Sequence, residues 1–212
     1  METLPVSGAG PELSSCLEQL ARLHPQVCPR QVLGVRMGLL AGESLAVDLP
    51  RRDKRLLVLV ETDGCFADGV SVATGCWLGR RTLRLVDYGR VALTVVDTLT
   101  TRAVRLRPRP HARSRALAWA PESADTWHAQ LIGYQVMPSA ELLEAQSVTL
   151  TTPLQQILGQ PGVRLTCVLC GEEVLNCREL HTPAGPVCAG CAAGPYYSPV
   201  SNSTTSTIDT LA

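Results

Sequence analysis

Four cysteines in the C-terminal part of the chain have the spacing of a metal site. They form two Cys-x-x-Cys pairs, Cys167/Cys170 and Cys188/Cys191, with 17 residues between the pairs. A two-residue gap lets one tight turn present both sulfurs, and the longer segment can fold as a hairpin that returns the second turn to the first. Four thiolates at one point bind zinc tetrahedrally, at about 2.3 Å from each sulfur. The spacing therefore predicts a structural zinc ion, with two disulfides or unligated cysteines as the alternatives.

A second set of soft ligands lies at predicted helix starts. His24 and Cys28 share the turn before a predicted helix over 29–47, and Cys65 opens a helix directly after the apolar run Leu56–Val60. A helix N-terminus carries a partial positive charge, which favours a thiolate over a thiol. Three soft ligands with an open fourth position would form a catalytic or substrate-binding metal site. The alternative is that these cysteines are small buried hydrophobic residues.

The remaining cysteines are assigned more weakly. Cys76 lies eleven residues after Cys65, or about 16 Å along an unbroken helix. It could then share an ion with Cys65 only if the helix bends or a neighbouring subunit supplies it. Cys177 and His181 lie between the two cysteine pairs and are expected to stay unligated, and Cys16 receives no role.

Apolar periodicity and the positions of glycine and proline predict the elements that hold these residues. The run Leu56–Val60 is continuously apolar, as in a central strand buried on both faces. The runs 82–87 and 91–97 flank the tight turn at Gly89, which is typical of a hairpin. Helices are predicted over 11–23, 29–47, 65–75, 112–120 and 124–136, and further strands over 101–107 and 147–150.

Three glycines recur at four-residue steps in the second predicted helix: Gly34, Gly38 and Gly42. Each glycine costs up to about 1 kcal/mol relative to alanine inside a helix. We therefore expect another backbone to approach this face closely, because only glycine leaves room for it.

Charge and composition argue against several classes of protein. The formal net charge is zero, so no global field attracts nucleic acid or an anionic membrane. The basic stretch from Arg102 to Arg115 has no interleaved aromatic residues, which favours a solvated strand edge and helix start over a nucleic-acid groove. No apolar run reaches the roughly 18 residues needed to span a bilayer, and the first residues lack the features of a signal peptide. We therefore expect a cytoplasmic protein, in which paired cysteines more often bind metal.

Five separate motifs resemble those of one known family in order and spacing. They are His24-Pro-Gln-Val-Cys28-Pro29-Arg30, Gly34-Val-Arg36-Met-Gly38, Glu61-Thr62-Asp63-Gly64-Cys65-Phe-Ala-Asp68, Thr74-Gly75-Cys76-Trp-Leu-Gly79 and Asp87-Tyr88-Gly89-Arg90. Together they resemble the FmdE/FwdE family of formylmethanofuran dehydrogenase components over most of residues 15–150. Longer members of that family are similar in carrying a C-terminal zinc ribbon of the TraR/DksA type.

The resemblance implies an α+β fold, like that of FwdE and of the GAPDH domain, in which helices pack on a mixed, mostly antiparallel sheet. It also implies a homodimer with a second divalent metal, expected to be zinc. By position, the candidate ligands are His24, Cys28, Cys65 and Cys76, and the residues that would support them are Asp63, Asp68 and Gln26. Gln26 replaces a histidine of the family motif and is a poor ligand for a soft ion. Arg30 replaces a glycine, so that it either admits an anionic ligand or fills the pocket.

We therefore expect a metal-binding domain over 11–155, a zinc ribbon over 163–194 and a disordered tail over 195–212. The function implied by the resemblance is that of a metal-binding accessory protein or subunit beside a molybdenum or tungsten oxidoreductase of one-carbon metabolism. Two alternatives remain open. The chain could be a small metalloenzyme with an open His/Cys site, or a regulatory adaptor that docks through its ribbon.

Overall fold

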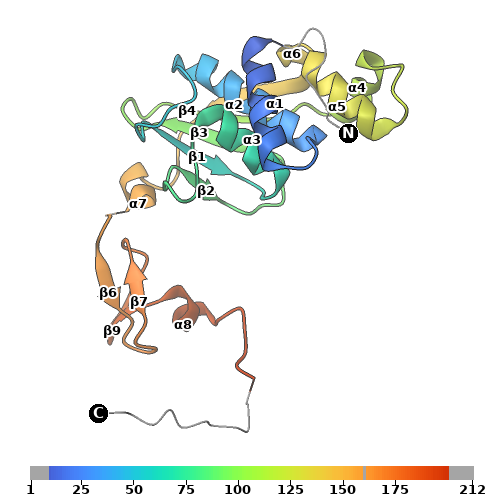
Figure 1. Ribbon diagram of the computed structural model, residues 1–212. Helices are drawn as coiled ribbons and strands as arrows, with labels where there is room; N and C mark the ends of the chain where they lie inside the picture. Colours follow the sequence, from blue (N-terminus) through green and yellow to red (C-terminus); the bar gives the residue numbers. More distant parts are fainter. Residues whose placement is uncertain (1–9, 160, 201–212) are drawn as a thin grey trace. The chain divides into compact units, whose positions relative to one another are not determined.

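The computed structural model describes residues 10–159 and 161–200 (Figure 1). The chain divides into two compact units, Met1–Leu154 and Gln155–Ala212, and each is described by itself. Most of the expected tail, residues 201–212, lies outside the described residues. Within the described ranges, no helix is both long and apolar enough to cross a bilayer.

The first unit is built on a five-stranded sheet with the strand order β2-β1-β3-β4-β5. β1 pairs in parallel with β2 and antiparallel with β3, and the two remaining pairings are antiparallel. The predicted α+β class with a mixed, mostly antiparallel sheet is therefore confirmed. The strands are β1 (Leu56–Val60), β2 (Leu83–Leu85), β3 (Leu93–Asp97), β4 (Ala103–Pro108) and β5 (Leu143–Val148).

The predicted hairpin between 82–87 and 91–97 is wrong. β1 lies between β2 and β3, so that Val58 pairs with Leu83 on one side and with Val95 on the other. The apolar β1 needs a strand on each side, and this requirement outweighs the local turn at Gly89. The prediction for the last strand is also misplaced, because β5 begins at Leu143, before the predicted 147–150.

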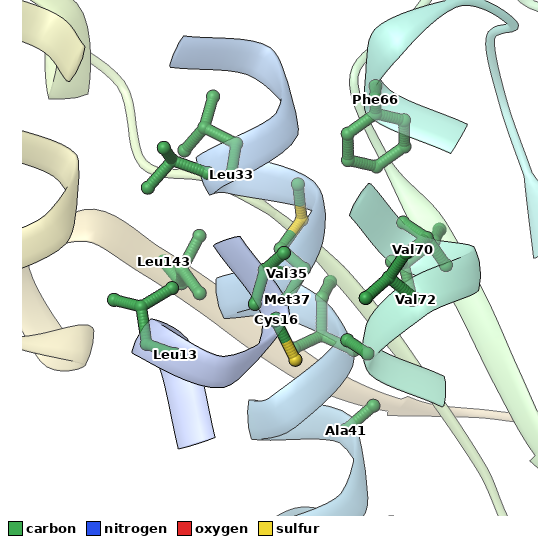
Figure 2. Packing of buried hydrophobic residues seen from close by; sticks show 14 of the residues in the cluster. Leu13, Cys16, Leu33, Val35, Met37, Ala41, Phe66, Val70, Val72 and Leu143 are labelled. Carbon is green, nitrogen blue, oxygen red and sulfur yellow. The ribbon is translucent and has the colours of Figure 1, made fainter. Parts of the chain in front are cut away.

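Helix α2 occupies the centre of the helical layer and contacts α1, α3 and α5 as well as the sheet. Figure 2 shows its side chains Val35 and Met37 between Leu13 of α1 and Val70 of α3. The core is made chiefly of leucine, valine and alanine, with Phe66 and Tyr134 as its largest members. The helices are α1 (Pro11–Leu23), α2 (Pro29–Leu45), α3 (Cys65–Thr74), α4 (Ala112–Trp119), α5 (Thr126–Val136) and α6 (Ser139–Leu142).

The predicted close approach of a backbone along the glycine face of α2 is confirmed for Gly34. A Cβ atom there would lie 2.3 Å from the carbonyl oxygen of Phe66 in α3, and one on Gly69 would lie 2.3 Å from the carbonyl oxygen of Gln31 in α2. The two helices therefore touch backbone to backbone, and we call this contact the α2–α3 crossing. Gly38 faces the side chain of Ala73 instead of a backbone.

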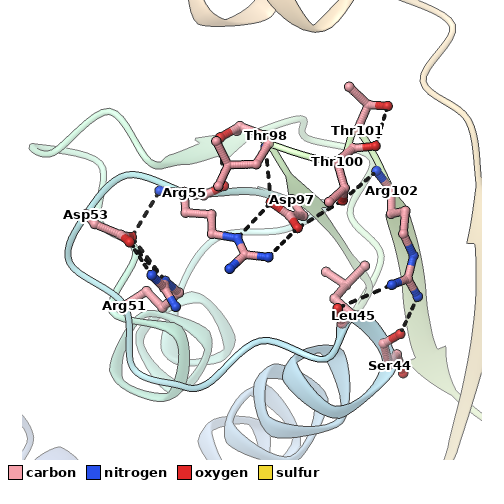
Figure 3. Close-up of polar contacts among 11 residues, drawn as sticks. Ser44, Leu45, Arg51, Asp53, Arg55, Asp97, Thr98, Thr100, Thr101 and Arg102 are labelled. Atoms are coloured by element: carbon pink, nitrogen blue, oxygen red, sulfur yellow. Dashed lines mark hydrogen bonds and ion pairs between the residues drawn. The ribbon is translucent and has the colours of Figure 1, made fainter.

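A buried carboxylate at the end of β3 holds the neighbouring loops (Figure 3). The side chain of Asp97 is 2% exposed and accepts two hydrogen bonds from the Arg55 guanidinium, at 3.0 and 2.8 Å. It also accepts hydrogen bonds from the Thr100 hydroxyl and the Leu99 amide. These donors, Arg55 first, hold the pKa of Asp97 well below its usual range. Arg102 donates to the carbonyl oxygens at the end of α2 (Figure 3).

The second unit consists of two short hairpins flanked by two short helices. β6 (Arg164–Thr166) pairs with β7 (Glu173–Leu175), and β8 (Leu180–Thr182) pairs with β9 (Gly185–Val187). Helix α8 (Ala189–Ala193) follows, and α7 (Leu154–Leu158) precedes the hairpins. The only buried hydrophobic cluster among the described residues of this unit contains Cys167, Val174 and Val187, with Cys188 and Cys191 packed against it.

Candidate metal centres

The structure brings the four cysteines of the second unit to one point. The sulfur atoms of Cys167, Cys170, Cys188 and Cys191 all lie within 4.8 Å of one another. Among the described residues, this is the only group of three or more His, Cys, Asp or Glu side chains close enough to hold an ion. Four sulfurs around a common centre match the ligand set of a closed structural zinc site.

Each cysteine pair is presented by one turn, as expected. The first turn follows β6 and closes with a hydrogen bond from the Gly171 amide to the Cys167 carbonyl, at 2.9 Å. Gly171 has a φ of +75°, a conformation that costs glycine little. The second turn opens α8, where Cys188 is the N-cap residue and Cys191 donates its amide to the Cys188 sulfur. The sulfurs of Cys170 and Cys188 are 3.9 Å apart, too far for a disulfide bond.

The thiols of this cluster favour different protonation states. The pKa of Cys167 is lowered to about 6, because the amides of Cys170 and Cys188 donate to its sulfur. The pKa of Cys191 is raised to about 12, because it hydrogen-bonds to the Cys188 and Cys170 sulfurs and further negative charge there is repelled. Without a metal, one thiol of the cluster therefore loses its proton readily, whereas the last thiol keeps its proton. A cation at the centre would stabilise all four thiolates and so favour loss of that last proton.

The second candidate centre lies where the N-termini of α2 and α3 meet. His24, which caps the end of α1, places its Nε2 atom 2.9 Å from the Asp68 carboxylate in the first turn of α3. Cys28 is the N-cap residue of α2, and Cys65 is the first residue of α3. The pKa of Cys28 is raised, first by burial and then by the neighbouring Cys65 thiol. Two pairs of polar side chains therefore lie at the two helix starts.

These residues do not form a closed ligand set. Among the described residues, His24, Cys28 and Cys65 are not close enough to one another to be grouped around one ion. Cys76 is not brought to this place: it follows the C-terminal end of α3, and its sulfur lies 3.7 Å from the carbonyl oxygen of Leu56. Cys65 begins α3 and Cys76 follows its C-terminal end, so the unbroken helix separates the two along its axis, by about 16 Å for eleven residues.

The residues expected to support the metal ligands differ in whether they contact those ligands. Asp68 contacts His24 directly, whereas Gln26 and Asp63 are exposed. Cys177 and His181 lie outside the four-sulfur cluster, and both are exposed. The basic stretch is mostly engaged within the fold: the ion pairs are Arg105 with Glu61, Arg107 with Glu144 and Arg115 with Glu141.

Residue-type reasoning missed the role of Glu61, which follows β1. Its carboxylate accepts from Arg105 at 2.7 Å and from Arg90 at 2.8 Å, and its carbonyl oxygen accepts from the amides of Tyr88 and Arg90. Glu61 thereby fixes the loop that leads from β2 to β3. A carboxylate directly after a fully apolar strand was the available signal, because such a group is buried only when it is paired.

We expect Glu61→Gln to lower the free energy of unfolding by about 2–3 kcal/mol at pH 7, because two guanidinium groups lose their anion. The pKa of Glu61 is lowered by Arg105 and Arg90. Its stabilisation is therefore complete above the unfolded value of about 4.3 and is lost as the pH falls through the lower folded value. Urea unfolding between pH 7 and pH 3 should show a smaller loss on acidification for the variant. An equal loss in both proteins would contradict this role.

Comparison with known proteins gives three consistent results. A model of the family described as "FmdE, Molybdenum formylmethanofuran dehydrogenase operon" matches residues 23–153. A curated relative from Archaeoglobus fulgidus, named a probable S-adenosyl-L-methionine-binding protein, is 38% identical over 98 residues, which is 45% of this chain and 27% of that protein. A solved FmdE-like protein of the tungsten formylmethanofuran dehydrogenase type, from Syntrophus aciditrophicus, superposes with a TM-score of 0.58 at 20% identity, over 88% of this chain and 95% of that one.

Proposed function

This chain belongs to the FmdE family, and we propose that it is a metal-binding accessory subunit that acts beside a molybdenum or tungsten oxidoreductase of one-carbon metabolism. The molybdenum or tungsten would belong to the partner enzyme. The accessory chain would be cytoplasmic and homodimeric, with its FmdE-like domain over 11–155 and its ribbon over 163–194. Binding of S-adenosylmethionine is not part of this proposal, because the match to that relative spans 27% of its length.

The observation that carries the proposal is the four-sulfur cluster. Its sulfurs come from two turns that are joined only by short hairpins. The hydrophobic cluster around them is too small to hold such a unit together alone. Zinc bound by Cys167, Cys170, Cys188 and Cys191 would supply that stability, because the free energy of binding becomes free energy of folding.

A second ion in the first unit is proposed at His24, Cys28 and Cys65, whose side chains would have to move closer together to bind it, because they are not grouped around one point in the structure. It is supported by the placement of the two thiols at the starts of α2 and α3. The expected thiolate at Cys28 is not favoured without an ion, because burial raises the pKa of that thiol, so a bound ion would have to displace the proton. When bound, such an ion would act as a Lewis acid with an open position. Asp68 would orient the His24 imidazole through the 2.9 Å contact. This is the site on which the stand-alone metalloenzyme alternative depends.

Metal analysis by mass spectrometry tests both sites. We expect two zinc ions per wild-type chain and one in a Cys28→Ala/Cys65→Ala variant, because the remaining imidazole cannot hold an ion alone. The matched control is Cys16→Ala/Cys76→Ala, which removes two buried thiols from outside the site and should leave two ions.

One ion in the wild type, lost only when ribbon cysteines change, would exclude the second site and leave a scaffold with a zinc ribbon. The adaptor alternative has its own support, because Val168 and Leu169 expose 49% and 66% of their surface on the ribbon. Co-expression with the oxidoreductase encoded in the same genome tests the partnership. A Leu169→Ser variant that no longer co-purifies would identify the ribbon as the docking element.

A further inference from the structure

One cavity of the first unit, with a volume of about 530 Å³, lies between the N-termini of α2 and α4. We propose that this cavity, the α2–α4 pocket, binds a phosphate monoester of a small planar organic molecule, of the size of a nucleoside monophosphate. It is distinct from both metal centres, since its wall contains none of their cysteines or histidines. Its volume is within the usual range for small-molecule sites, about 300–1,000 Å³.

The polar wall of the α2–α4 pocket is cationic. Arg30, His111 and Arg113 line it, and no aspartate or glutamate does. No carboxylate of the described residues pairs with Arg30 or Arg113, in contrast to Arg107 and Arg115 nearby. With Arg109, three exposed arginines line this partly apolar cavity, and none of them forms an ion pair with a carboxylate of the described residues, which favours a bound anion.

Helix α4 adds to this charge. Its eight residues run from Ala112 to Trp119, and the N-cap residue His111 makes no side-chain hydrogen bond to the first turn. The amides of Arg113 and Ser114 therefore lie at an uncapped helix start beside the cavity. Such amides bind phosphate oxygens, and the helix dipole favours the negative charge.

Two buried polar side chains at the pocket are the independent indication of a ligand. Tyr134 is 2% exposed and Gln130 is 8% exposed, and both line the cavity. No hydrogen bond from the Tyr134 hydroxyl or the Gln130 amide group to another described residue is found, and neither group is among the fully buried unpartnered atoms, so both polar groups reach the open space of the cavity. Buried polar groups are nearly always partnered, by protein, by water or by a ligand. Burial raises the pKa of the Tyr134 hydroxyl, and the positive charge of Arg113 acts in the opposite direction.

Apolar residues also line the cavity. They include Pro29, Leu33, Val91 and Pro108, which suit the face of a planar ring. A phosphate monoester carries a charge of about −1.5 to −2 at pH 7, and this charge matches two guanidinium groups and a helix N-terminus better than a single carboxylate does. The ring would pack on the prolines while the phosphate meets Arg30 and Arg113.

Isothermal titration of the full chain with AMP, adenosine and inorganic phosphate tests the pocket. We expect AMP to bind at least about 10-fold more tightly than either adenosine or phosphate alone, because only AMP engages both the cationic and the apolar lining. Arg30→Ala/Arg113→Ala should weaken AMP binding by about 10-fold or more. Tyr134→Phe, which keeps the ring, should weaken it by a smaller factor. S-adenosylmethionine, which carries adenosine without a phosphate, should bind no more tightly than adenosine.

The matched control is Arg115→Ala, which removes the same charge from the same helix at a residue that does not line the cavity. It should leave AMP affinity within about 2-fold. The proposal is overturned if AMP does not bind at millimolar concentration, if it binds no better than adenosine, or if the Arg30/Arg113 variant binds it as wild type does. If that double variant misfolds, the AMP affinities of the Arg113→Lys and Tyr134→Phe variants are compared with that of wild type instead.

Discussion

A Cys167→Ser variant is expected to lose one zinc ion per chain and to unfold the ribbon, residues 163–194, while the first unit stays folded. The Cys167 thiol is buried in the centre of the only hydrophobic cluster that the structure describes in this unit. Structural zinc contributes about 10–16 kcal/mol in small domains of this kind, far more than two short hairpins and three buried side chains can supply. Amide NMR spectra and limited proteolysis would show the loss.

The control is Cys177→Ser, which changes an exposed cysteine of the same unit outside the cluster. It should keep its zinc and its dispersed spectrum. Treatment of wild type with a strong chelator should reproduce the Cys167→Ser spectrum, and restored zinc should reverse it. A ribbon that stays dispersed after its zinc is removed would show that the hairpins hold together without metal.

Gly34→Ala is expected to lower the free energy of unfolding of the first unit by about 3 kcal/mol or more, and its melting temperature by about 10 °C. The added Cβ would lie 2.3 Å from the Phe66 carbonyl oxygen and 2.9 Å from the Val70 nitrogen. Neither atom belongs to a side chain that can rotate away, so α2 and α3 must separate. Calorimetry of the variant measures the effect directly.

Gly79→Ala is the matched substitution, because a Cβ there would meet no atom within 4 Å. It should change stability by less than about 0.5 kcal/mol. If the two variants had the same melting temperature, α2 and α3 would be able to separate at little cost in stability, contrary to what their backbone contact indicates. The Gly34→Ala variant should also bind less metal in the first unit, because the crossing holds Cys28 and Cys65 together.

The five longer helices, α1 to α5, could be predicted closely, whereas the short helices α6, α7 and α8 were not predicted. The first three helices have a local signal at one end. Pro11 and Pro29 open the first two helices, and Gly75 closes the third in a left-handed conformation. The ribbon was equally predictable, since a Cys-x-x-Cys turn is built within four residues. These features depend on interactions between residues that are close along the chain, so hydrophobic periodicity and residue spacing were sufficient to predict them.

The strand pairing could not be predicted from such signals. The partner of β2 is β1, which lies more than twenty residues earlier, and the turn at Gly89 gives no indication of it. The α2–α4 pocket was missed for the same reason, since Arg30 and Arg113 are more than eighty residues apart in the chain. In the candidate centre of the first unit, the positions of Cys28 and Cys65 at helix starts could be predicted from the sequence. The distance between their thiols could not.

The motif Gly34-Val-Arg36-Met-Gly38 is explained without any metal. Gly34 admits the backbone of α3, and Gly38 admits Ala73. Arg36 donates hydrogen bonds to the Tyr134 and Met137 carbonyl oxygens at the end of α5. We therefore expect this signature to follow the scaffold and not the proposed metal site. Homologues that keep the proposed site should instead be recognised at the positions of His24, Gln26 and Cys65, where we expect a substitution to leave the architecture intact.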